Sequence, residues 1–128
     1  MEERQVTPLR TVQAHQIING VNTEFALTVF VDRIFIVVSQ VGTFGTLVEA
    51  RQKDSISGKF QAEIHVRLGR RDDPLLLVYA RQLLEHFGVP LGLPVIAALG
   101  LKDRSTATFE AVMKQVEALF LEARAAAP

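Results

Sequence analysis

Apolar and polar residues alternate along much of the first 70 positions, and the spacing of the apolar residues then lengthens to three or four. Alternation with a period of two is typical of strands that have one buried face, whereas a period near 3.6 is typical of amphipathic helices. The first part of the chain therefore predicts five strands, at residues 9–18, 21–31, 34–38, 46–50 and 59–68.

Short turn sequences separate the first four of these strands. Asn19-Gly20 is a strong signal for a two-residue hairpin turn, and Asp32-Arg33 predicts a second one. Gly42 and Gly45 bracket Thr43-Phe44 and predict a hairpin loop of three to four residues. Because strands joined so closely pair antiparallel, we expect the first four to form a meander.

The third strand is apolar on both of its faces. Ile34, Ile36 and Val38 point to one side, and Phe35 and Val37 point to the other. The helices of a small domain can cover one face of its sheet, so we expect another chain to cover the second. The pattern alone leaves open which alternate set of residues meets that partner.

The second part of the chain predicts two helices with a strand between them. Asp73 before Pro74 is typical of a helix start, with the Asp73 carboxylate as the N-cap, and Gly88 is expected to end this helix. Residues 95–101 are uniformly apolar and predict a buried central strand, and residues 106–124 predict the second helix. The fold expected is α+β: a mostly antiparallel sheet of about six strands, with two helices on one face and the other face dimerising.

Composition narrows the class of protein. A chain of 128 residues with 48% hydrophobic and 22% charged residues is ordinary for a single globular domain, with residues 1–8 and 124–128 expected to be flexible. Fourteen basic side chains balance fourteen acidic ones, which argues against nucleic-acid or membrane binding. The lack of cysteine, of a secretory signal and of a long apolar run predicts a cytoplasmic protein, with the nucleus as a second possible location.

The residue types that carry chemistry are dispersed. His15, His65 and His86 belong to different elements, so no metal site is expected. Asp72 and Asp73 precede a helix and are interpreted as capping residues, and the basic cluster at Arg67, Arg70 and Arg71 as a solvated loop. We therefore expect no enzymatic activity, no catalytic residue and no cofactor.

Several segments resemble the proteasome assembly chaperone 3 family. They are SQVGTFGTLV at residues 39–48, Gly20-Val21 upstream, and LGRRDDPLLLVYARQL and LGLKDRS downstream, in the order that the family has. The resemblance implies a non-catalytic chaperone that pairs with proteasome assembly chaperone 4, or with itself as a homodimer. It also implies binding to an alpha-ring subunit of the proteasome core particle, which promotes alpha-ring assembly.

Two sets of contact residues are expected from the pattern. The polar loop at residues 51–58 and the aromatic residue of the neighbouring glycine turn are the candidates for client binding, namely Arg51, Lys53, Asp54, Ser55 and Phe44. The apolar third and sixth strands supply the candidates for the dimer interface, namely Ile36, Val38, Ile96 and Ala98. The alternative hypothesis is a small-molecule or nucleotide-binding α+β domain that uses the loop from Gly42 to Gly45.

Overall fold

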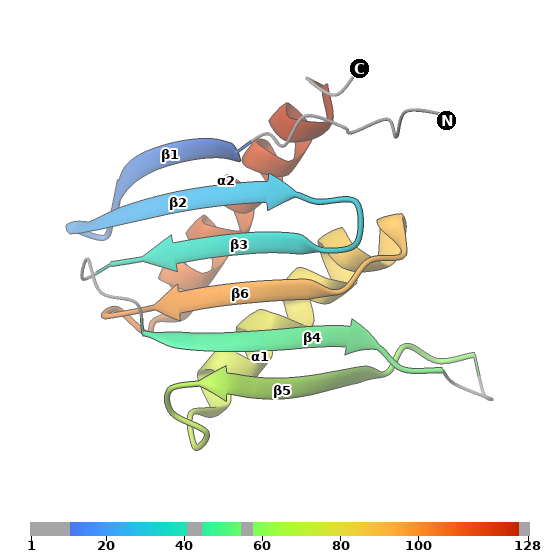
Figure 1. The fold of residues 1–128 in the computed structure, drawn as a ribbon. Helices are drawn as coiled ribbons and strands as arrows, with labels where there is room; N and C mark the ends of the chain where they lie inside the picture. The colour runs from blue at the N-terminus through green and yellow to red at the C-terminus, as the bar shows by residue number, and fades with distance from the viewer. Residues whose placement is uncertain (1–10, 41–44, 55–57, 126–128) are drawn as a thin grey trace.

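The computed structural model describes residues 11–40, 45–54 and 58–125. Six strands form one mixed, mostly antiparallel sheet, in the order β1-β2-β3-β6-β4-β5. The strands are β1 (Thr11–Ile18), β2 (Val21–Val29), β3 (Ile34–Ser39), β4 (Thr46–Gln52), β5 (Ala62–Leu68) and β6 (Val95–Gly100). Figure 1 views the sheet with α1 (Pro74–Leu83) and α2 (Thr106–Ala125) behind it, so the α+β prediction with both helices on one face is confirmed.

The core lies between the sheet and the two helices. Helix α2 packs on β1 and β2, and α1 packs mainly on β4. Aromatic side chains join α2 to α1 and to the segment after α1. The rings of Tyr79 and Phe109 meet edge to face with centroids 4.9 Å apart, and those of Phe87, just after α1, and Phe120 are 5.1 Å apart. Val112 and Val116 of α2 are almost completely buried, so the apolar spacing read from the sequence marks the helix face that packs on the sheet.

The predicted four-stranded meander is wrong after its third strand. β3 pairs parallel with β6, and β4 pairs antiparallel with the opposite edge of β6, so β6 lies between the two strands that were expected to form a hairpin. Both ends of the connecting segment contact the end of β6: the Gln40 amide donates to the Gly100 carbonyl at 2.7 Å, and Gly45 lies against Leu99.

Glycine is required at position 45 for two reasons. Its φ is +70°, a left-handed conformation that side chains disfavour, and an added Cβ would lie 2.2 Å from the carbonyl oxygen of Leu99. The sequence signal at Gly45 therefore marks a close passage over β6, and its interpretation as one end of a hairpin loop is corrected.

Several predicted boundaries also change. β2 ends at Val29 rather than at residue 31, and β5 begins at Ala62 rather than at residue 59. After α1 the chain continues as a π-helical turn, Leu84–Gly88, and then as a short 3-10 segment, Val89–Leu91, so Gly88 does not end the helical structure. The last turn ends at Gly92 in a left-handed conformation. Helix α2 includes Arg124 and Ala125, which were assigned to a flexible tail; the other predicted flexible residues lie outside the described ranges.

The start of α1 uses Asp73 differently from the prediction. Asp73 occupies the N-cap position with an extended backbone and Pro74 follows it, but its side chain makes no capping hydrogen bond. The Asp73 carboxylate instead accepts a hydrogen bond from the guanidinium of Arg104, in the loop before α2. Asp73 thus ties together the starts of the two helices.

Candidate functional site: the open face of the sheet

The sheet has one face under the helices and one face that no helix of the described residues covers, here called the open face. Along β3, Ile34, Ile36 and Val38 lie under the helices with at most 1% of their surface exposed, whereas Phe35 and Val37 point the opposite way and are half-buried. Ile36 and Val38 were predicted in a dimer interface. They belong to the core instead, because side chains alternate across a strand and the helices cover their side.

Apolar side chains run across the middle of the open face. Register pairs place Phe35 beside Ile96 and Val37 beside Ala98, on the two central strands of the sheet. Ala26 of β2 lies beside Val37, and Leu47 of β4 lies beside Ala98, on either side. We call this set the apolar stripe: Ala26, Phe35, Val37, Leu47, Ile96 and Ala98. Of the predicted interface residues, Ile96 is half-buried within it, whereas Ala98 lies on the same face but is only 2% exposed in the single chain.

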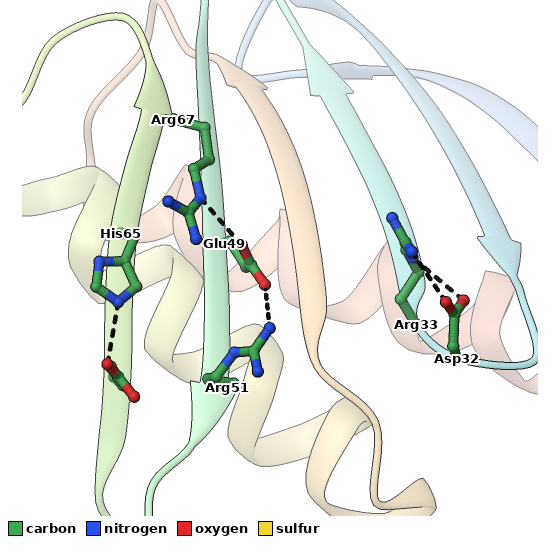
Figure 2. A network of polar contacts seen from close by, with 7 residues as sticks. Asp32, Arg33, Glu49, Arg51, His65 and Arg67 are labelled. Atoms are coloured by element: carbon green, nitrogen blue, oxygen red, sulfur yellow. Dashed lines mark hydrogen bonds and ion pairs between the residues drawn. The ribbon is translucent and has the colours of Figure 1, made fainter.

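Figure 2 shows an ion-pair cluster on β4 and β5. It borders the stripe, because Glu49 is the register partner of Ile96. Glu49 accepts a hydrogen bond from Arg51 at 2.6 Å and two from Arg67, at 2.7 and 3.0 Å. The Arg51 and then the Arg67 guanidinium hold the pKa of the Glu49 carboxyl below its usual range. On the same border, His65 is hydrogen-bonded to Glu63 at 3.1 Å.

A shallow hollow of about 540 Å³ borders the stripe on its other side, over β1, β2 and β3. Its lining includes the polar side chains of Gln13, His15 and Glu24, with Ala26 and Val37 of the apolar stripe. His15 is hydrogen-bonded to the Asn22 side chain at 2.9 Å. An apolar centre with polar borders is the usual composition of a protein–protein interface.

Three of the predicted client-binding residues, Arg51, Lys53 and Asp54, are described, and they lie at the end of β4. Arg51 belongs to β4 rather than to a loop, and it lines a cleft of about 290 Å³ with Asp54 and residues of the 88–94 segment. Lys53 continues the ladder from β4, because its amide donates to the Gln61 carbonyl at 2.9 Å. Phe44 and Ser55 lie outside the described residues. Whether Phe44 and Ser55 lie near Arg51 therefore stays a prediction.

Sequence reasoning missed a buried polar network at the end of β3. The Gln40 side chain is 6% exposed, and its Oε1 accepts hydrogen bonds from the amides of Lys102 and Asp103, both at 2.8 Å. Its Nε2 donates to Thr23 at 3.2 Å. A polar residue next to an apolar strand was the available signal, but the partners of its Oε1 lie more than 60 positions further along the chain.

Asp103 extends this network to the first hairpin and to α2. Its carboxylate accepts hydrogen bonds from the Asn19 side chain, the Thr108 hydroxyl and the Ser105 amide, and these hold the pKa of Asp103 well below its usual range. Asn19 and Gly20 both have positive φ, so the predicted hairpin turn is confirmed. The network fixes the loop after β6 against the end of the sheet.

The histidines are placed in separate environments. His15 and His65 lie near opposite edges of the open face, whereas His86 is bonded to the Gln82 carbonyl beside α1. Within residues 11–40, 45–54 and 58–125, acidic and histidine side chains form no group of three that could hold a metal ion. In the same ranges no helix is long and apolar enough to cross a membrane.

These features describe a protein-binding module that presents one face of a sheet. A sequence model of the proteasome assembly chaperone 3 family matches residues 36–119. Three relatives described as proteasome assembly chaperone 3 agree with it. The protein of Bos taurus is 33% identical over 113 residues, which is 86% of this chain and 92% of the relative. The protein of Nematostella vectensis is 28% identical over 84% of this chain and 86% of the relative. The protein of Homo sapiens is 31% identical over 81% of this chain and 87% of the relative.

The fold is also that of a solved chaperone. A chain from the crystal structure of a novel chaperone complex for yeast 20S proteasome assembly superposes with a TM-score of 0.65, over 87% of this chain and 98% of that one, at 14% identity. The present chain belongs to the proteasome assembly chaperone 3 family, which is non-catalytic.

Proposed function

We propose that this chain binds an alpha-ring subunit of the proteasome core particle and promotes alpha-ring assembly, as one half of a chaperone dimer. Its partner in the dimer is proteasome assembly chaperone 4 or a second copy of the chain. The observation that carries the proposal is the apolar stripe, on a sheet face that no described helix covers, in a member of this chaperone family. The proposed location is the cytoplasm, with the nucleus as a second one.

The dimer contact is assigned to the open face. Phe35, Val37, Leu47 and Ile96 are half-buried within the chain, and a flat apolar surface of this kind is stabilised when a second protein removes it from water. Specific interfaces of standard size bury about 800 Å² on each partner. The open face of a six-stranded sheet is large enough to supply that area.

The contact with the alpha subunit is assigned to the end of β4, at the border of the open face and away from the apolar stripe. Arg51, Lys53 and Asp54 are exposed, and Arg51 and Asp54 line the cleft beside the 88–94 segment. Polar groups at the end of a strand suit a client that must later be released, since they hydrogen-bond without a large obligate apolar contact. Phe44 is proposed as a second contact.

Co-purification from eukaryotic cells tests the proposal. The tagged chain is expected to recover alpha-type proteasome subunits together with assembly chaperone 4. Ile96→Asp, on the open face, should lose the chaperone partner, while Leu121→Asp, a control at an exposed apolar position of α2, should keep it. Recovery of no alpha-type subunit by the folded parent chain would contradict the proposed function.

The client contact has its own variants. Replacing residues 53–58 by a glycine-serine stretch of equal length, or Phe44 by alanine, should reduce recovery of the alpha subunit while leaving the dimer intact. If both variants recover it as well as the parent does, the alpha subunit binds elsewhere on the molecule.

A further inference from the structure

One carboxylate on the open face differs from the others in having no partner within the described residues. Glu49 is paired with two arginines and Glu63 with His65, as Figure 2 shows for Glu49. Glu24 lies on the same face, because its neighbour Phe25 is in the core, and it makes no hydrogen bond or ion pair with another described residue. Among the described residues, therefore, no group compensates the charge of Glu24.

Glu24 stands at the wall of the hollow beside the apolar stripe. Gln13 and His15 of β1 and Ser39 of β3, the register partner of Glu24, also line the hollow, and Ala26 and Val37 add small apolar groups. His15 faces Glu24 across the β1–β2 ladder, but its imidazole is hydrogen-bonded to Asn22. The hollow thus combines a carboxylate with no partner among the described residues, the Gln13 amide, the Ser39 hydroxyl and an apolar surface. A long side chain with an apolar stem and several donors at its end has the matching chemistry.

When a protein docks on the open face, the charge of Glu24 destabilises the complex unless it is paired. A protein that covers the stripe also removes water from Glu24, and an ionised carboxylate that loses water without a partner destabilises the complex. A guanidinium compensates the charge and donates to the Gln13 amide oxygen as well, since its donors are arranged in a planar fork. A lysine ammonium supplies the charge without that geometry.

We propose that the hollow beside Glu24 receives an arginine side chain of the protein that docks on the open face, and that Glu24 pairs with it. The inference rests on the proposed function, because it names the chemistry of the partner at the same surface. Glu24 then selects against partners that present an apolar or acidic group at this position. It also makes association sensitive to salt.

The test is to measure the dissociation constant of the dimer, formed by the chain alone and by the chain with assembly chaperone 4, at low and high salt. Glu24→Gln keeps the size of the side chain and removes its charge. We expect it to weaken association about tenfold or more and to reduce the salt dependence. Glu110→Gln, the matched control on the exposed surface of α2, should change neither.

The possible results separate this inference from the proposed function. A parent chain that associates as tightly as Glu24→Gln does overturns the role of Glu24 and leaves the docking surface in place. A parent that associates with neither partner overturns both. A monomeric parent that is stabilised by a small molecule, with the effect lost in Glu24→Gln, shows a ligand site in the hollow and also overturns the inference.

Discussion

Phe35 of β3 and Ile96 of β6 are register partners on the open face, whereas their chain neighbours Ile36 and Ala97 are partners on the face under the helices. One residue along the strand thus separates a core position from a candidate interface position. Ile36→Ala should lower the free energy of unfolding by about 2–5 kcal/mol, because it leaves a cavity in the core. Phe35→Ala should cost the folded monomer less, and weaken the dimer about tenfold or more.

Chemical denaturation of the separated monomers and sedimentation over a range of concentrations distinguish the two effects. If Phe35→Ala dimerises as the parent does, the apolar stripe is not the dimer interface.

The close passage at Gly45 predicts a large difference between two glycine substitutions. Gly20→Ala meets nothing within 4 Å and costs only the strain of its positive φ, about 1 kcal/mol. Gly45→Ala adds a clash with the Leu99 carbonyl and should cost at least about 2 kcal/mol more. Urea denaturation of both variants gives the comparison. Equal losses would mean that β3, β6 and β4 are not arranged with β6 in the middle.

The ion-pair cluster predicts a pH-dependent contribution to stability. Because the folded pKa of Glu49 is lowered by Arg51 and Arg67, the carboxylate stabilises the fold above its unfolded pKa, near 4.3. That contribution is lost as the pH falls through the folded value. Glu49→Gln should therefore be less stable than the parent at pH 7, by about 1 kcal/mol, and the difference should shrink below pH 4. A difference that is constant with pH would contradict the pairing.

The buried hydroxyl of Tyr79 predicts a substitution that does not destabilise the protein. Tyr79 is fully buried, burial raises its pKa to about 12, and its hydroxyl has no hydrogen-bond partner among the described residues. Tyr79→Phe keeps the edge-to-face contact with Phe109 and should leave stability unchanged or raise it by up to about 1 kcal/mol. A melting temperature clearly below that of the parent would show that the Tyr79 hydroxyl has a hydrogen-bond partner in solution.

The contact between Asp73 and Arg104 predicts coupling between the starts of the two helices. A double-mutant cycle with Asp73→Ala and Arg104→Ala should give a coupling free energy of about 0.2–1 kcal/mol, since the arginine is half-exposed. If only Asp73→Ala lowers the free energy of unfolding, and the effects of the two substitutions add, the result would instead support the N-cap role predicted from the sequence.

The sequence by itself determined the local structure. The change of period separates strands from helices, Asn19-Gly20 specifies the first turn, and the uniformly apolar segment at residues 95–101 predicts a strand buried on both sides. These features follow from steric preferences and side-chain alternation within a few residues. The segments that carry the family resemblance are also short stretches of sequence, so they too can be identified without the tertiary structure.

Tertiary structure decided which strands are neighbours and which side of each strand is open. The insertion of β6 between β3 and β4 depends on contacts between residues more than 40 positions apart. A glycine turn has the same sequence signal whether its two strands pair with each other or enclose a third strand. The same insertion brings Ile96 beside Phe35 and builds the apolar stripe. An alternating pattern that is apolar on both sides cannot show which side the helices cover, because burial depends on where the helices pack and not on the strand itself.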